Sequence, residues 1–273
     1  MAARPVSDRW RVTSRRPVDL SARDASAKTG APGDKDATKA HTATLRARLA
    51  ELQAKLYAEG SRSLLVVLQA MDAGGKDGTI RAVFEGVNPQ GVKVVSFKAP
   101  TPEELAHDFL WRVHAQVPSD GDITVFNRSH YEDVLVVRVH DLVPEAVWRG
   151  RYARIRAFEE LLHAEGTTIV KIMLHISAEE QKERLQERID NPEKRWKFNP
   201  ADLSERHHWD AYQEAYGEAL GQTTARHAPW YVVPADRNWY RNWAVLQILV
   251  DTLEQMNPQF PPAAEGAEDA VVV

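Results

Sequence analysis

The sequence predicts an α/β fold in which helices cover both faces of a parallel β-sheet of about five strands. Apolar runs of strand length alternate along the chain with stretches of helix length, which is typical of a parallel sheet with crossover helices. The run at 63–69 (SLLVVLQ) is uninterrupted through its apolar centre, as expected of a strand buried on both faces. Hydrophobic residues are 43% and charged residues 27% of the 273 residues. A globular chain of this size and composition buries a substantial core.

In the first half, order is expected to begin near Thr42. Leucines at 45, 49, 52 and 56 then form one apolar stripe on a helix, and Gly60 is well placed to end it. The segment 101–104 (TPEE) is a capping box with proline at the first helical position, so a helix should run from there to Val113. The other expected elements are the strand 63–69, the helix 77–85 and the strand 92–97.

The second half continues the alternation. Ser177 and Glu180 form another capping box, which predicts a helix start at 178. Ligands of parallel sheets bind beyond the carboxyl ends of the strands, so side chains at those ends are the first candidates for a site. The expected elements are the strand 122–127, the helices 132–140 and 151–165, the strand 169–176, the helix 178–189, the strand 230–233 and the helix 239–256.

Composition excludes several classes of protein. The chain has no cysteine, which excludes disulfides, thiolate nucleophiles and cysteine-ligated metal sites. A net charge of −4 gives no sign of bulk nucleic-acid binding. The longest apolar run, 64–68, is far too short for a membrane helix, and no apolar run follows the basic residues of the N-terminus. We expect a cytoplasmic protein that binds neither nucleic acid nor a membrane.

The two ends of the chain differ in composition from the middle. Residues 1–38 carry many basic residues among Ala, Ser, Thr, Gly and Pro, without apolar periodicity, which predicts a flexible arm. The alternative is an arm that wraps a neighbouring subunit, with Trp10 and Val12 as anchors. Residues 39–260 are expected to form a single domain, and 261–273 a disordered tail.

The segment 69–78 (QAMDAGGKDG) joins the first strand to a helix and has features of a phosphate-binding loop. A Walker A loop has Gly, four residues and then Gly-Lys-Ser/Thr. Here Ala70 replaces the first glycine and Asp77 replaces the hydroxyl residue. Small residues let backbone N–H groups face an anion, while the helix N-terminus and Lys76 add positive charge. The candidate phosphate-binding residues are Ala73, Gly74, Gly75, Lys76, Asp77 and Gly78.

Asp72 is an unusual residue to find inside such a loop, because its carboxylate would repel a bound phosphate. We interpret Asp72 as a metal ligand or as the base that orients the acceptor phosphate. The plainer interpretation of the whole segment is a tight glycine turn with a solvated lysine.

The strand 122–127 ends in a second group of polar residues, 127–133 (NRSHYED). A Walker B strand ends in an acidic residue that holds Mg²⁺. Asn127 is neutral, but Glu132 and Asp133 follow about one helical turn later and restore the charge. Arg128 is placed to contact a transferring phosphoryl group. The alternative is an ordinary polar strand end with surface ion pairs.

Basic residues gather between the strands 169–176 and 230–233, where Asn191-Pro192 breaks a helix. Interleaved acidic residues are typical of an ordinary solvated helix. We favour a lid over the phosphate loop, spanning about 182–209, that closes and excludes water. The basic lid candidates are Arg184, Arg188, Lys194, Arg195 and Lys197.

Together these segments resemble the polyphosphate kinase 2 family of P-loop kinases. The sequence at 126–134 (FNRSHYEDV) is similar to class III of that family, in which Asn replaces an Asp. The resemblance implies a P-loop kinase-like three-layer α/β/α sandwich with a helical lid, assembled as a homo-oligomer, a dimer or a tetramer. The other segments that carry it are 69–80, 102–116 (PEELAHDFLWRVHAQ), 174–188, 190–200 (DNPEKRWKFNP) and 228–242 (APWYVVPADRNWYRN).

The resemblance also implies roles for the matched residues. Asp72 and Lys76 would be Walker A residues, with Lys76 on the transferring phosphates, and Asn127 and Arg128 the Walker B pair. Glu132 would lie near the metal and the nucleotide. The lid bases would line a polyphosphate channel or clamp nucleotide phosphates. The implied catalytic residues are Asp72, Lys76 and Arg128, and the implied ligands of Mg²⁺ or Mn²⁺ are Asp72, Glu132 and, more weakly, Asp133.

The implied reaction moves the terminal phosphate of inorganic polyphosphate onto AMP and ADP to make ADP and ATP. One anhydride replaces another, so both directions should run. One alternative is an ATP-dependent nucleoside monophosphate kinase, against which Asp77 at the Ser/Thr position counts. Another is a non-catalytic nucleotide- or polyphosphate-binding module, which would not need Lys76, Arg128 and the lid bases together.

Overall fold

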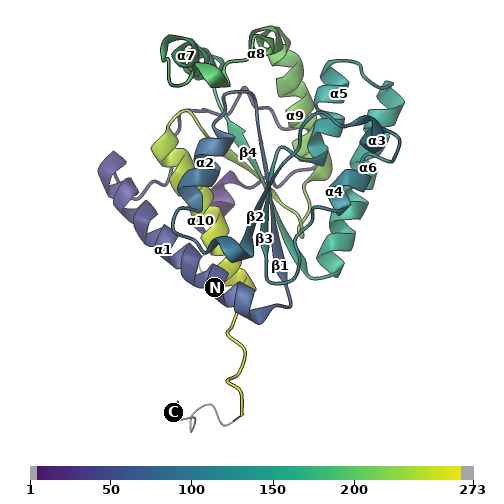
Figure 1. Ribbon diagram of the computed structural model, residues 1–273. Helices are drawn as coiled ribbons and strands as arrows, with labels where there is room; N and C mark the ends of the chain where they lie inside the picture. Colours follow the sequence, from purple (N-terminus) through teal and green to yellow (C-terminus); the bar gives the residue numbers. More distant parts are fainter. Residues whose placement is uncertain (1–4, 266–273) are drawn as a thin grey trace.

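The computed structural model describes residues 5–265, and a parallel five-stranded sheet lies at its centre (Figure 1). The strand order is β2-β3-β1-β4-β5, with β1 in the middle and paired to both β3 and β4. The predicted α/β class and the parallel sheet of about five strands are confirmed. The strands are β1 (Ser63–Ala70), β2 (Val92–Ser96), β3 (Ile123–Asn127), β4 (Thr167–His175) and β5 (Trp230–Pro234).

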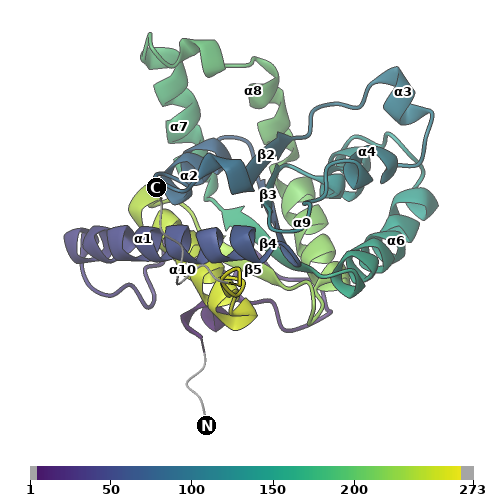
Figure 2. The same ribbon diagram turned by 60° about the horizontal axis from the view of Figure 1, so that its bottom comes forward.

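Helices cover both faces of the sheet (Figures 1 and 2). The α-helices are α1 (Lys35–Glu59), α2 (Lys76–Val83), α3 (Pro102–Leu105), α4 (Trp111–His114), α5 (Val136–Val139), α6 (Glu145–Ala164), α7 (Ala178–Asp190), α8 (Ala201–Glu205), α9 (Trp209–Thr223) and α10 (Asn238–Met256). Short 3₁₀ helices are η1 (Val6–Trp10), η2 (Pro89–Gly91), η3 (His130–Val134), η4 (Arg195–Lys197) and η5 (Arg206–His208).

Alternate residues of β1 pack into two separate hydrophobic clusters, one on each face of the sheet. Leu64, Val66 and Leu68 pack with α1, α2 and α10 on one face, whereas Leu65 and Val67 pack with α4, α6 and α9 on the other. Every residue of β1 is buried, which explains its continuous apolar sequence. Helices on both faces and strands on both sides therefore hold β1 in place, and its carboxyl end lies at the centre of one edge of the sheet.

Several elements differ from the sequence expectation. The expected helix 102–113 is broken into α3 and α4, because the Asp108 side chain accepts a hydrogen bond from the Leu110 backbone N–H and forms a turn between them. The expected helix 132–140 is η3 followed by α5, and the helix expected from 151 begins at Glu145. Helix α9 was not expected, since small residues such as Gly217 and Gly221 obscure its apolar pattern.

Residues 5–34 are packed against the domain, in contrast to the flexible arm expected from composition. The Val12 backbone N–H donates to the Trp230 carbonyl at 2.8 Å, and the Val18 N–H donates to the Gly217 carbonyl at 2.9 Å. A Cβ atom on Gly217 would lie 2.3 Å from the Val18 carbonyl oxygen, so this close approach requires glycine. The segment thereby covers the β5 edge of the sheet.

Trp10 and Val12, the anchors of the alternative prediction of a subunit-wrapping arm, are buried in this chain's own core. Trp10 and Val12 are each 4% exposed. Helix α1 also begins earlier than Thr42, because the Asp34 side chain caps it by accepting from the N–H groups of Asp36 and Ala37. Residues 1–4 of the arm and 266–273 of the expected tail lie outside the described residues.

Replacing Trp10 by alanine is expected to destabilise the fold. The indole packs edge-on against Trp243, with ring centroids 5.5 Å apart, and its N–H donates to the Tyr240 hydroxyl at 3.1 Å. Truncating a buried Trp costs about 3–5 kcal/mol. Urea unfolding at a fixed protein concentration measures the change.

Trp196→Ala is the matched control, because Trp196 is 78% exposed and its loss should change the free energy of unfolding by less than about 0.5 kcal/mol. Equal stabilities of the Trp10→Ala variant and the wild type would mean that residues 5–34 do not pack on the domain in solution.

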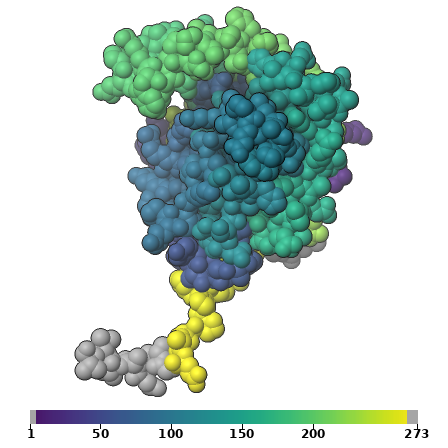
Figure 3. Space-filling view, turned by 45° about the vertical axis from the view of Figure 1, so that its right-hand side comes forward, coloured from purple at the N-terminus to yellow at the C-terminus, as the bar shows by residue number. Residues whose placement is uncertain are grey.

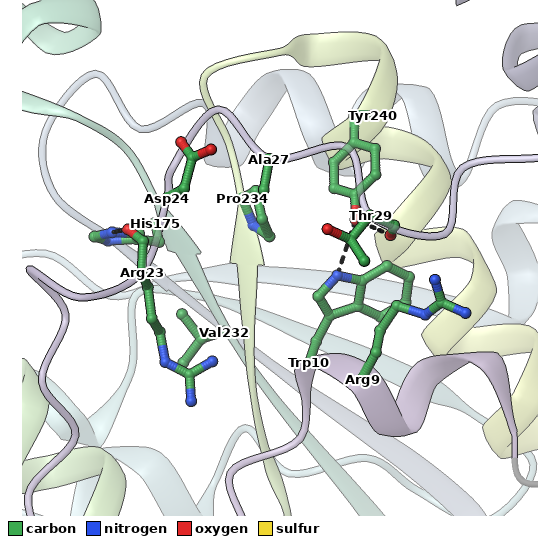
Figure 4. A pocket seen from close by; sticks show the side chains of 10 residues that line it. All are labelled: Arg9, Trp10, Arg23, Asp24, Ala27, Thr29, His175, Val232, Pro234 and Tyr240. Carbon is green, nitrogen blue, oxygen red and sulfur yellow. Dashed lines mark hydrogen bonds between the residues drawn. The ribbon is translucent and has the colours of Figure 1, made fainter. Parts of the chain in front are cut away.

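A cavity of about 210 Å³ lies between this N-terminal segment and the end of the sheet (Figure 4). The cavity separates residues of the segment from β5 and α10, and the Tyr240 hydroxyl closes one side by donating to the Thr29 carbonyl at 2.8 Å. His175, at the end of β4, hydrogen-bonds the Arg23 carbonyl at 3.0 Å on the other side.

Helices α7 and α8 rise above the carboxyl edge of the sheet (Figure 2) and form an overhang in the space-filling view (Figure 3). The predicted lid, residues 182–209, contains most of α7 and all of α8. No helix in the described residues 5–265 is both long and apolar enough to cross a lipid bilayer.

Candidate active site

The loop after β1 and the residues after β3 lie side by side at the carboxyl edge of the sheet. The strand register pairs Leu68 with Asn127, and the Arg128 N–H donates to the Leu68 carbonyl at 3.1 Å. The two polar segments singled out in the sequence therefore lie together, beneath the overhang of α7 and α8.

The phosphate loop has a strained backbone at Ala73, whose φ of 58° is costly for any residue except glycine. Gly75 also has a positive φ, of 93°, which glycine adopts without strain. A Cβ atom on Gly74 would lie 2.6 Å from the Ala70 Cβ atom. Lys76 begins α2 directly after this turn, so unpaired N–H groups of the helix N-terminus are available to an anion.

Lys76 is half-buried at the start of α2. Its ammonium donates to the Ala70 carbonyl at 3.1 Å. Burial lowers the pKa of Lys76 and the positive Arg128 lowers it further, whereas the carboxylates of Asp72, Glu132 and Asp77 oppose this shift.

Arg128 pairs with the loop carboxylate. Its Nη2 atom lies 2.8 Å from Asp72 Oδ1, and its backbone has a φ of 61°. Burial works against the charge of Arg128, but Glu132 and Asp72 outweigh it and raise the pKa of the guanidinium. The catalytic residues expected from the sequence, Asp72, Lys76 and Arg128, are therefore brought together.

Asn127 and Glu132 are each held by a hydrogen bond between a side-chain amide and a carboxylate. The Asn127 amide donates to Asp77 Oδ1 at 2.7 Å, and the Gln69 amide donates to Glu132 Oε1 at 2.9 Å. Gln69 is fully buried in β1 and was not among the expected site residues. Its position among apolar strand residues was the only signal available.

Asp133 lies outside this cluster, in contrast to the expectation that it joins Asp72 and Glu132 on a metal. Its carboxylate pairs with Arg151 of α6 at 3.0 Å. Burial raises the pKa of Asp133, and the facing arginine acts in the opposite direction. The neighbour of Glu132 in sequence therefore serves to fasten η3 to α6. His130 is buried in the same region and lies 3.5 Å from Glu159, which agrees with a structural role.

The carboxylates of Asp72 and Glu132 suit a metal ion only if a substrate supplies the remaining ligands. No three His, Asp or Glu side chains converge as a metal cage among residues 5–265. Mg²⁺ in phosphate-handling sites is commonly held by one or two carboxylates together with phosphate oxygens and water. Asp72 and Glu132, which both act on Lys76, fit that pattern.

Arg184 differs from the other expected lid bases because it holds the phosphate loop itself. Its Nη1 atom donates to the Ala73 carbonyl at 3.1 Å and its Nη2 atom to the Ala235 carbonyl at 2.7 Å. Gln181, one turn earlier on α7, donates to the Asp72 carbonyl at 2.9 Å. Neither contact was expected, since a helix position does not reveal which distant carbonyl it meets.

The remaining expected bases lie farther out on the lid and have partners within it. The ammonium of Lys197 lies 5.0 Å from the centre of the exposed Trp196 ring. The other pairings are Arg188 with Asp202 at 2.9 Å, Lys194 with Glu187 at 2.5 Å, and the Arg195 Nε–H with the Ile189 carbonyl at 2.8 Å.

Known proteins of one family resemble this chain over most of its length. The sequence model of the family Polyphosphate kinase 2 (PPK2) matches residues 33–261. The chain is 60% identical to the AMP/ADP-polyphosphate phosphotransferase of Meiothermus ruber, over 88% of this chain and 90% of that one. It is 49% identical to the ADP-polyphosphate phosphotransferase of Rhodopseudomonas palustris, over 78% of each chain.

A solved structure supports the same relationship. The polyphosphate kinase 2 of Arthrobacter aurescens TC1 superposes with a TM-score of 0.93 at 46% identity, covering 98% of this chain and 96% of that one. The range matched by the family model contains the phosphate loop, Arg128 and the lid. The chain therefore belongs to the polyphosphate kinase 2 family.

Proposed function

We propose that this chain transfers the terminal phosphate of inorganic polyphosphate onto AMP and ADP, forming ADP and ATP in a reversible reaction. The observation that carries the proposal is the meeting of Lys76, Arg128 and the α2 N-terminus at the carboxyl edge of the sheet, beneath a basic lid. The name of the Meiothermus relative supports polyphosphate, AMP and ADP as substrates, and that of the Rhodopseudomonas relative supports polyphosphate and ADP.

The reaction requires charge neutralisation more than covalent chemistry. An oxygen of the nucleotide's terminal phosphate forms a bond to the terminal phosphorus of polyphosphate. The anhydride bond behind that phosphorus breaks, and the shortened polyphosphate keeps the electron pair. Lys76 and Arg128 face the charge that spreads over the transferred group, and the α2 N–H groups hold its oxygens. The lid excludes water, which would otherwise accept the phosphoryl group.

We further propose that Asp72 and Glu132 hold Mg²⁺ or Mn²⁺ together with phosphate oxygens. When bound, such an ion neutralises phosphate charge and polarises the phosphoryl oxygens. Asp72 is already shared with Arg128, so its carboxylate balances one positive group before substrates arrive. Asp77 is held by Asn127, in place of the hydroxyl that a Walker A loop uses for Mg²⁺.

Phosphorus NMR tests the proposal directly. Purified protein is incubated with polyphosphate, AMP and Mg²⁺ without ATP, and parallel samples omit polyphosphate or replace it with ATP. We expect ADP signals first and ATP signals next, only where polyphosphate is present. ADP alone would restrict the acceptor to AMP. Turnover only with ATP as donor would identify a nucleoside monophosphate kinase, and no turnover with either donor would indicate a binding module.

A further inference from the structure

Arg241 is a buried arginine that lies directly against the phosphate loop. It is 3% exposed, in the first turn of α10. A Cβ atom added to Gly75 would lie 2.0 Å from Arg241 Nη1, and one added to Gly78 would lie 3.5 Å from Nη2. The guanidinium therefore fills the space that a side chain would need at the turn where α2 begins.

The charge of Arg241 has no carboxylate partner. The guanidinium donates to the side-chain oxygens of Asn238 at 2.8 Å and of Asn242 at 3.1 and 3.2 Å, and within residues 5–265 it forms no ion pair. Burial, followed by the positive Arg184, lowers the pKa of Arg241 to about 9, although the carboxylate of Glu180, which is paired with Arg184, acts in the opposite direction. The group remains charged at neutral pH.

An unpaired buried cation is costly, and proteins commonly neutralise or pair such a group. The two other arginines at this loop are already paired, since Arg128 contacts Asp72 and Arg184 contacts Glu180. Arg241 is thus the buried guanidinium at the loop whose charge is left for a ligand to balance. The ligand of matching chemistry is a polyphosphate or nucleotide phosphate group beside Gly75 and Lys76.

We propose that Arg241 is a positioning residue for phosphoryl transfer: it sets the Gly75–Gly78 turn and supplies a fixed positive charge that favours phosphate in the loop. The inference rests on the proposed function for the identity of the anion. It extends that function to a residue on α10. This helix follows the edge strand β5, whereas Arg128 follows β3, on the other side of the central strand β1.

Binding of tripolyphosphate, measured by calorimetry at pH 7 without nucleotide, tests this role. Arg241→Gln should weaken tripolyphosphate binding by about tenfold or more, the loss expected for one charge-assisted contact. Arg241→Lys should recover a large part of the affinity, because it keeps the charge while losing the planar hydrogen bonds. Arg237→Gln removes a charge from the exposed start of the same helix and should bind like the wild type.

Three results would overturn the inference: a folded Arg241→Gln variant that binds like the wild type, an Arg241→Lys variant as weak as the glutamine variant, or a wild-type protein that does not bind tripolyphosphate. If the glutamine variant fails to fold, the arginine Nε–H resonances of the wild-type protein decide the question. A shift of the Arg241 resonance on tripolyphosphate addition supports the role, and an unmoved resonance contradicts it. Failure of the transfer reaction alone leaves this binding result intact.

Discussion

Replacing Lys76 by alanine is expected to reduce phosphoryl transfer by at least about a thousandfold, comparable to removing a charge that acts directly on a transferring phosphoryl group. The ammonium makes one hydrogen bond, to the Ala70 carbonyl, and the carboxylates of Asp72, Glu132 and Asp77 favour its charged form. Its loss leaves the loop without its central cation. Initial rates of ATP formation from polyphosphate and ADP measure the effect.

The same substitution should leave the fold intact, because the turn is held by Arg184, Arg241 and its own glycines. Thermal unfolding of the variant checks this expectation. Lys93→Ala, at an exposed lysine of β2, is the control for loss of one positive charge and should keep wild-type rates. A folded Lys76→Ala variant with turnover within tenfold of the wild type would remove this loop from the active site.

Replacing Lys171 by methionine is expected to destabilise the protein by about 3–5 kcal/mol, because it leaves a buried carboxylate without its counter-ion. Lys171 and Glu159 are 0% and 1% exposed, and their charged atoms lie 2.5 Å apart. The ammonium also donates to the Tyr131 hydroxyl at 3.0 Å and the Thr223 carbonyl at 2.8 Å. Burial disfavours the charge of Glu159, but the facing ammonium outweighs it and holds the pKa of Glu159 below its ordinary value.

Urea unfolding of a small set of variants isolates this cause. A double variant, Lys171→Met with Glu159→Leu, removes both charges and should recover much of the lost free energy. Lys39→Met breaks an exposed pair with Asp36 at 4.0 Å and should change stability by less than about 1 kcal/mol. A Lys171→Met variant as stable as the wild type would show that the pair is not charged in the folded protein.

Local sequence patterns predicted the parts of this site whose geometry is itself local. The apolar run 63–69 predicts a central strand, and the small residues after it predict the turn that places Lys76 at a helix N-terminus. The end of the strand 122–127 places Asn127 and Arg128 at the same edge of the sheet, because parallel strands end together. These inferences needed only strand direction and adjacency.

Other features depend on which distant groups meet, and no local pattern contains that information. Glu132 and Asp133 are adjacent in sequence, yet one turns to Gln69 and the other to Arg151. The composition of residues 5–34 indicates disorder, but a few residues such as Trp10 and Val12 enter the core while backbone hydrogen bonds to β5 and α9 hold the rest. Composition averages over a segment and therefore misses such sparse anchors.

The two contacts from α7 to the phosphate loop divide the predicted lid into a part tied to the loop and an outer part. Gln181 and Arg184 bind the first half of α7 to the carbonyls of Asp72 and Ala73. We therefore expect any movement of the lid to begin beyond these contacts, at the helix end near Asp190, where Asn191 leaves the helical conformation. Lys194, Arg195 and Lys197 lie beyond that point, so such a movement would change their distance from Lys76 and leave Gln181 and Arg184 in place.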